Sequence, residues 1–126
     1  MSMRTPLSRV RGLGSAKSGT EHFWRQRLTS IANIPLVLFF VISIVMHAGS
    51  DHATFIAYFS HPIVAIIMLL MIVSALFHMC LGMQVIIEDY VHSEGLKIIA
   101  LLGNTFFSIA VGTGCVFAIL KLSFGN

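Results

Sequence analysis

Charge is scarce in this sequence. Only 10% of its 126 residues are Asp, Glu, Lys or Arg, while 56% are hydrophobic and the mean hydropathy is +0.89. Soluble domains carry about 25% charged residues. The composition therefore predicts an all-α integral membrane protein with little material for a separate soluble domain. The net charge of +3 gives no sign of a nucleic-acid partner, because most basic residues lie in one short tail.

Motifs of soluble catalysis are also missing. The sequence has no internal repeat, no glycine-rich phosphate loop, no nucleophile–base pair and no HExxH. Its two cysteines, Cys80 and Cys115, lie inside apolar runs and lack metal-type spacing, so they are interpreted as small buried residues. Function must therefore reside within the membrane helices, at their ends, or in a partner chain.

Acidic residues are absent from the first 20 positions, which carry four basic residues, Arg4, Arg9, Arg11 and Lys17. We expect a flexible basic tail over residues 1–20, extended or disordered, followed by a membrane domain over residues 21–126. No short apolar core with a cleavage site follows the tail, which argues against a signal peptide. A mitochondrial transit peptide is the alternative, since such peptides are rich in Arg and Ser and poor in acid.

Three apolar runs are long enough to cross a bilayer, which takes about 20 helical residues. We predict spans at about 28–48, 62–87 and 96–122, joined through a short amphipathic piece at 53–60 and a brief loop at 88–94. A proline within the first span is tolerated, because packed neighbours re-satisfy the carbonyl that it frees.

Small and polar residues in the third span predict helix packing. Ser108 with Gly112, and Ala110 with Gly114, follow the four-residue spacing that lets helices approach closely. Asn104 is the one amide in this span, and we expect it to make an interhelical hydrogen bond rather than bind a ligand.

Basic residues set the expected orientation. Six of the eight precede Leu28, and the loop after the first span has none. The positive-inside rule then places the N-terminus in the cytoplasm, or the matrix, and the C-terminus outside, in the periplasm of a bacterium. Asp89 and Tyr90 therefore lie on the same side as Arg25 and Arg27.

His78 is the most informative residue, because it lies deep in an apolar run. A histidine in hydrocarbon is costly and needs a metal, a proton path or a polar partner. Gly82 and Ser74, one turn to either side, leave a smooth channel where a flat group or another helix fits. Asp89, eleven residues on, returns to the same face about 16 Å away. The plainer interpretation is a structural hydrogen bond from His78 to a neighbouring helix.

Depth separates His78 from the other intramembrane histidine. His78 is about 15 Å from the inner end of its span, whereas His47 is about 30 Å from the inner end of the first. The two should not share an iron, and the third span has no His or Met. If His78 ligates haem iron, a second axial ligand must come from another subunit.

The pattern His78-x3-Gly82-x6-Asp89-Tyr90, together with His22-x4-Arg27, resembles the D-type hydrophobic membrane anchor of succinate dehydrogenase, respiratory complex II, in its alphaproteobacterial version. The resemblance runs from Gly12 to the end and is most specific in the second span. It implies that the three transmembrane helices form half of a heterodimeric, haem-binding anchor bundle.

The resemblance also implies cofactors, partners and residue roles. His78 is the axial ligand of a haem b shared with a C-type cytochrome b556 anchor subunit, and Tyr90 with Asp89 belongs to a ubiquinone site. Arg27, and more weakly His22, face the haem propionates. The other partners are an iron–sulfur subunit, a flavoprotein subunit and the lipid bilayer.

The implied function is the membrane anchor of succinate:ubiquinone oxidoreductase, passing electrons from succinate to the quinone pool, without activity alone. Its membrane is the bacterial inner membrane, or alternatively the mitochondrial inner membrane. The rival interpretations are a fumarate reductase-type anchor and a non-enzymatic three-span scaffold or assembly protein.

Overall fold

The computed structural model describes residues 5–12 and 19–125, without the side chains of Ser8, Arg9 and Gly19. Within these ranges every regular element is a helix. They are α1 (Pro6–Val10), α2 (Gly19–His47), α3 (His52–Phe59), α4 (Pro62–Tyr90) and α5 (Glu94–Phe124). Three of them, α2, α4 and α5, are long and apolar enough to cross a membrane. The predicted all-α class with three spans is therefore confirmed.

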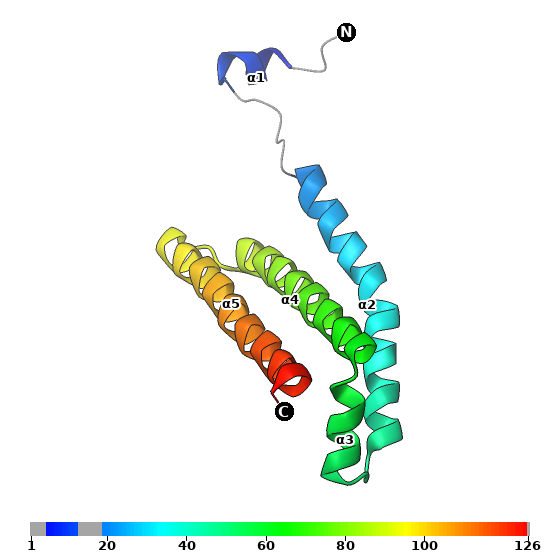
Figure 1. The fold of residues 1–126 in the computed structure, drawn as a ribbon. Coiled ribbons are helices and arrows are strands. Elements are labelled where there is room, and N and C mark those ends of the chain that lie inside the picture. Colours follow the sequence, from blue (N-terminus) through cyan, green and yellow to red (C-terminus); the bar gives the residue numbers. More distant parts are fainter. Residues whose placement is uncertain (1–4, 13–18, 126) are drawn as a thin grey trace.

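Helix α4 is the central element, and it packs against both α2 and α5 (Figure 1). The short helix α3 folds back from the end of α2 and contacts α4 and α5. Gly49, in the turn between α2 and α3, has a φ of +88°. This left-handed conformation costs a glycine little, because glycine has no Cβ to clash with the backbone.

The packed core lies at the α3 end of the bundle and is small. Phe59, Val64 and Met68 are buried there, with Met68 only 3% exposed. Ser43 is the most buried polar residue described, at 1%, and its hydroxyl lies 3.0 Å from that of Tyr58. Most other large apolar side chains are exposed at the surface of the chain, as expected for helices that lie in lipid.

The helices extend further than the hydrophobic runs predicted. Helix α2 begins at Gly19 and continues through Pro35, changing direction near its middle (Figure 1). Helix α4 begins with Pro62 in its first turn, where proline is tolerated, and continues to Tyr90. The predicted 88–94 loop is therefore wrong at both ends, because α4 includes residues 88–90 and α5 begins at Glu94, which leaves only residues 91–93 between the helices. Asp89 and Tyr90 belong to the last turn of α4.

The expected tail is described only in part. Pro6–Val10 form the helix α1 instead of the extended chain that we expected, with proline as its first residue. Residues 1–4 and 13–18 lie outside the described ranges. The amphipathic piece near 53–60 is confirmed as α3, where the Thr54 hydroxyl donates to the Asp51 carboxylate and holds the pKa of that carboxyl below its ordinary value.

Packing between α4 and α5 follows two of the predicted contacts. Asn104 Nδ2 donates to the backbone oxygen of Cys80 on α4 at 2.9 Å, which confirms the interhelical hydrogen bond. A Cβ added at Gly112 would lie 2.9 Å from a methyl of Leu76, so this glycine permits close approach. Gly114 meets nothing within 4 Å. The Ala110–Gly114 pair therefore does not pack within this chain.

Candidate functional site

His78 points from α4 toward α2, where it meets two hydroxyl groups. Its Nδ1 lies 3.2 Å from Oγ1 of Thr29 and 3.4 Å from Oγ of Ser30. Ser74, one turn before His78 on α4, makes no such bond, and its buried hydroxyl oxygen has no hydrogen-bond partner among the described residues. Nε2 of His78 has no hydrogen-bond partner among residues 5–12 and 19–125. The imidazole is thus held on one side and free on the other.

A polar stripe on α2 faces this part of α4. It consists of His22, Gln26, Thr29, Ser30 and Asn33, which recur at intervals of three and four residues and therefore share one helical face. Three of these side chains have a fully buried atom without a partner: Nε2 of His22, Oε1 of Gln26 and Oδ1 of Asn33. Sequence reasoning missed Gln26, Thr29, Ser30 and Asn33, although their spacing within an apolar helix was the signal.

Gly82 allows α2 to lie close to α4 at this level. A Cβ added there would be 3.3 Å from Nε2 of Gln26. The smooth channel that the sequence predicted beside His78 is therefore occupied, on this side, by a helix of the same chain.

The C-terminal end of α4 presents Asp89 and Tyr90 to the exterior of the chain. Tyr90 is 77% exposed, and Asp89 is exposed as well. Because α4 is continuous from Pro62 to Tyr90, Asp89 stays on the face of His78, about 16 Å further along the axis. No hydrogen bond joins either side chain to another of the described residues. Both are available to a molecule outside this chain.

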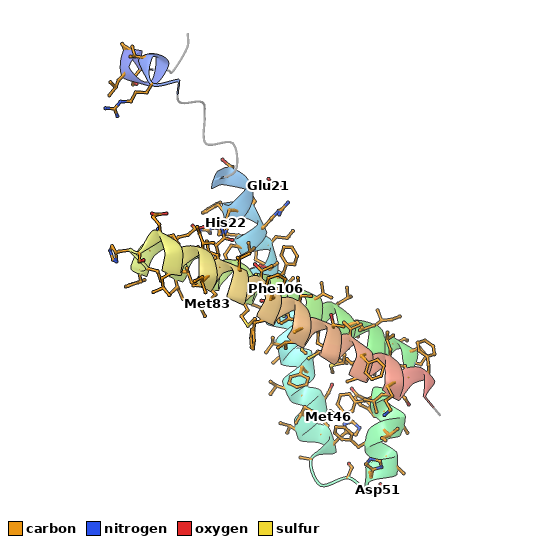
Figure 2. The ribbon with its side chains drawn as sticks, turned by 90° about the vertical axis from the view of Figure 1, so that its left-hand side faces the viewer. Glu21, His22, Met46, Asp51, Met83 and Phe106 are labelled. Atoms are coloured by element: carbon orange, nitrogen blue, oxygen red, sulfur yellow. The ribbon has the colours of Figure 1, made fainter. Side chains whose placement is uncertain are left out.

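Arg27 and His22 do not come together. The guanidinium of Arg27 lies 4.6 Å above the ring of Phe23 on an exposed face. His22 is on the stripe that faces α4, one turn before Gln26. Figure 2 shows Glu21 and His22 near one end of α2 and Asp51 beyond its other end. Arg25, one turn after Glu21 on α2, forms an ion pair with it.

His47 belongs to a separate cluster at the opposite end of α2. Its Nδ1 lies 2.8 Å from the backbone oxygen of Ser43, and its ring stacks on Tyr58 at 4.0 Å between centroids. It follows Ser30 by 17 residues, which is about 26 Å along a helix. The predicted separation of His47 from His78 is therefore confirmed. Among the described residues, no three His, Cys, Asp or Glu side chains gather into a metal site.

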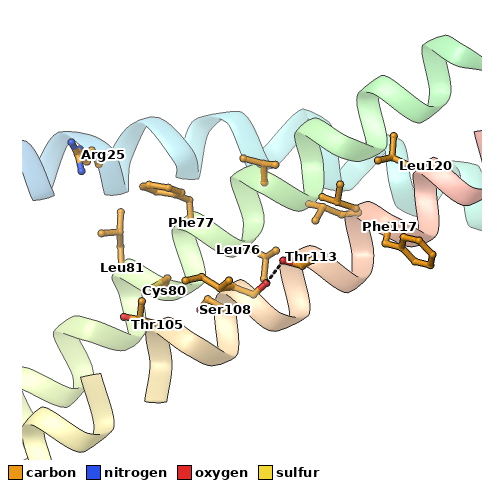
Figure 3. Close-up of a pocket in the computed structure, with 15 residues that line it drawn as sticks. Arg25, Leu76, Phe77, Cys80, Leu81, Thr105, Ser108, Thr113, Phe117 and Leu120 are labelled. Atoms are coloured by element: carbon orange, nitrogen blue, oxygen red, sulfur yellow. Dashed lines mark hydrogen bonds between the residues drawn. The ribbon is translucent and has the colours of Figure 1, made fainter. Parts of the chain in front are cut away.

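An apolar groove of about 750 Å³ follows the seam between α4 and α5. Figure 3 shows its wall, with Phe77 and Leu81 on α4 and Thr105, Thr113 and Phe117 on α5. The Thr113 hydroxyl donates to the backbone oxygen of Ile109 at 2.8 Å. The groove is thus an apolar surface rather than a polar binding site.

Three membrane-length helices around a polar contact at one intramembrane histidine define a multi-pass helical membrane protein. The family described as succinate dehydrogenase/fumarate reductase transmembrane subunit matches residues 1–112. This chain belongs to that family.

Curated relatives carry the same designation. The succinate dehydrogenase hydrophobic membrane anchor subunit of Paracoccus denitrificans is 30% identical over 121 residues, covering 96% of this chain and 93% of the relative. That of Rickettsia bellii is 33% identical over 106 residues, covering 84% and 85%. The succinate dehydrogenase membrane anchor subunit of Reclinomonas americana is 32% identical over 88 residues, covering 68% and 73%. No solved structure matches the chain significantly.

Proposed function

We propose that this chain is the D-type membrane anchor of a succinate:ubiquinone oxidoreductase. It contributes one axial ligand, His78, to a b-type haem and part of the site where ubiquinone is reduced. Family membership supports the anchor role, and the observation that carries the haem proposal is the one-sided bonding of His78. A histidine that served only to join two helices would need no free nitrogen, whereas a metal ligand needs one nitrogen held and the other open.

If His78 holds the haem iron, a second protein ligand would have to come from another subunit. Within the part of the chain that the structure describes, His47 is about 26 Å from the level of His78 along α2, and α5 contains no His or Met. A C-type cytochrome b anchor that supplies the second ligand accounts for this. When bound, the haem supplies a site that accepts and returns one electron at a time. The chain's own task is to hold the iron through Nε2 and to exclude water with apolar helices.

Two further residues fit the periphery of that haem unequally. Nε2 of His22 is buried without a partner about 10 Å nearer the inner end of α2 than the Thr29 level. To reach a propionate, that nitrogen would have to leave its buried position against α4, whereas the exposed guanidinium of Arg27 would only have to leave the ring of Phe23. Arg27 is therefore the more accessible of the two.

Tyr90 and Asp89 form this chain's part of the ubiquinone site. The Tyr90 hydroxyl can donate to a quinone carbonyl oxygen and stabilise the negative charge that develops there on reduction. Asp89 can accept a hydrogen bond and relay the protons that convert the quinone to the quinol. Their exposure at the end of α4 supports contact with a substrate and with an iron–sulfur subunit at the inner surface.

The electrons originate on a flavoprotein partner that oxidises succinate, and they pass through the iron–sulfur subunit to ubiquinone. The basic N-terminal region favours an inner-membrane orientation with the N-terminus in the cytoplasm, or in the matrix of a mitochondrion. The curated relatives are named for succinate dehydrogenase, which favours this direction over fumarate reduction.

The test is a reduced-minus-oxidised absorption spectrum of the complex purified through a tagged copy of this chain. The wild type should show a low-spin b-type signal together with a flavoprotein and an iron–sulfur protein. His78→Ala should abolish or alter that signal, whereas His52→Ala, at an exposed position beyond the other end of α2, should not. An unchanged spectrum in His78→Ala would remove His78 from ligation. A complex without haem or these partners would favour the scaffold interpretation.

A further inference from the structure

Two hydroxyl groups on α2 face Nδ1 of His78, the nitrogen that a haem iron bound at Nε2 would leave unused. Thr29 lies 3.2 Å and Ser30 lies 3.4 Å from Nδ1, and both are part-buried. We propose that Thr29 and Ser30 are positioning residues that hold His78 in the tautomer protonated at Nδ1, with the lone pair on Nε2. This inference rests on the proposed haem ligation and adds residues to which no role has been assigned.

The hydrogens of the two hydroxyls already take part in hydrogen bonds to the backbone of α2. Oγ1 of Thr29 lies 2.9 Å from the backbone oxygen of Arg25 and 3.1 Å from that of Gln26. Oγ of Ser30 lies 2.7 Å from the backbone oxygen of Gln26. A carbonyl oxygen can only accept, and a hydroxyl has a single hydrogen to donate. Each hydroxyl therefore donates to its own helix and turns a lone pair toward His78.

Acceptors facing Nδ1 decide which nitrogen carries the proton. A neutral imidazole has one N–H and one lone pair. With two acceptors beside Nδ1, the N–H must be there, because the alternative tautomer would place lone pairs against each other in a weakly polar interior. Ser74, one turn away on α4, does not compete, since its hydroxyl makes no hydrogen bond to any of the described residues. The contact leaves the Nε2 lone pair available for iron.

The same contact fixes the ring in orientation. Both hydroxyls are tied to the backbone of α2, so they cannot follow the imidazole if it turns. An N–H bonded to a rigid acceptor also raises the basicity of the opposite nitrogen, which strengthens the bond to a metal and favours its oxidised state. Thr29 is the nearer acceptor, so its replacement should have a larger effect on the haem than the replacement of Ser30.

The experiment compares the complete complex carrying Thr29→Val, Ser30→Ala or both with the wild type. Haem content relative to flavin, the midpoint potential of the b-type haem and the EPR g values of its low-spin iron are measured. In the double variant we expect a raised midpoint potential, changed g values and about tenfold weaker haem retention, at the lower end of the range for outer-shell partners. Thr29→Ser keeps the acceptor and should restore the wild-type values.

Matched controls separate this effect from general loss of a hydroxyl. Thr113 and Ser123 on α5 also donate to their own helix, at 2.8 Å and 2.9 Å, but they do not face a histidine. Thr113→Val and Ser123→Ala should leave the potential and g values unchanged. If the double variant fails to accumulate, the comparison of Thr29→Val with Thr29→Ser decides the question.

The outcomes distinguish this inference from the proposal beneath it. If His78→Ala abolishes the low-spin signal while the Thr29 and Ser30 variants leave potential and g values at wild type, His78 is a ligand but the positioning role is refuted. If His78→Ala leaves the signal intact, the ligand itself is refuted, and the positioning role falls with it.

Discussion

Replacing Gly82 by leucine should separate α2 from α4 and release His78 from its hydrogen bonds. A single added Cβ would lie 3.3 Å from the amide nitrogen of Gln26, the end of a flexible side chain that can move by a few tenths of an ångström. Gly82→Ala should therefore be tolerated. Leucine adds three further carbons, and a helical leucine covers the turn before it, which here carries His78.

The magnitudes decide which interaction gives way. Overpacking of this kind costs about 1–3 kcal/mol, whereas an interhelical hydrogen bond within a membrane is worth about 0.6 kcal/mol on average. The contacts of His78 with Thr29 and Ser30, at 3.2 Å and 3.4 Å, are already near the limit for a hydrogen bond. A separation of the two helices by about 0.5 Å would break both. The steric cost of the leucine therefore exceeds the free energy of the hydrogen bonds, and the hydrogen bonds of His78 should break.

The assay is a redox titration of the b-type haem in the purified complex, with its EPR spectrum. Gly82→Leu should reproduce the raised potential and changed g values expected of the Thr29→Val/Ser30→Ala double variant, while Gly82→Ala should match the wild type. Gly103→Leu is the matched control, because a Cβ added there meets nothing within 4 Å. Equal effects of leucine at positions 82 and 103, or none at position 82, would refute the reasoning.

Two further predictions concern the C-terminal end of α4 and the contact between α4 and α5. Tyr90→Phe should lower ubiquinone reduction on the order of 10²-fold, the effect of losing one donor to a developing oxyanion, while succinate oxidation with an artificial acceptor stays intact. Tyr58→Phe, which removes the other tyrosine hydroxyl, serves as its control, and equal loss in both assays would sink the quinone role. Asn104→Leu should lower the free energy of unfolding in mixed micelles by about 0.6 kcal/mol and at most about 1.7 kcal/mol, because it removes one interhelical hydrogen bond. Thr105→Val, whose hydroxyl bonds only its own helix, should change that free energy less; the opposite order would contradict the assigned role of Asn104.

The membrane-spanning helices could be predicted from the sequence because length and hydrophobicity alone determine them. A bilayer requires a run of about 20 apolar helical residues, and three such runs are visible without any tertiary information. Their ends were predicted less well. Helix α4 continues to Tyr90, since helical hydrogen bonds do not stop where the hydrocarbon does. Hydropathy predicts where the chain leaves the lipid, whereas backbone hydrogen bonding determines where the helix ends.

Residues that share a helical face could be inferred from spacing, but the residues that they contact on other helices could not. His78 was recognised as the central residue from its cost in hydrocarbon. Its hydrogen-bond partners do not lie on its own helix, because the packing of α2 on α4 brings Thr29 and Ser30 to it from 49 and 48 residues earlier, respectively. In the same way, spacing alone did not show that Gly112 packs against Leu76 whereas a Cβ at Gly114 would meet nothing within 4 Å.

The sequence by itself determined the all-helical class, the three spans, the family and the histidine around which function is proposed. It did so because hydropathy, charge asymmetry and the spacing of a few polar residues are properties of the chain alone. Only the tertiary structure decided which nitrogen of His78 is held, which side chains hold it, and that Arg27 and His22 face different ways. Those relations depend on how α2 lies against α4, and that arrangement is fixed by side-chain packing between residues far apart in the chain.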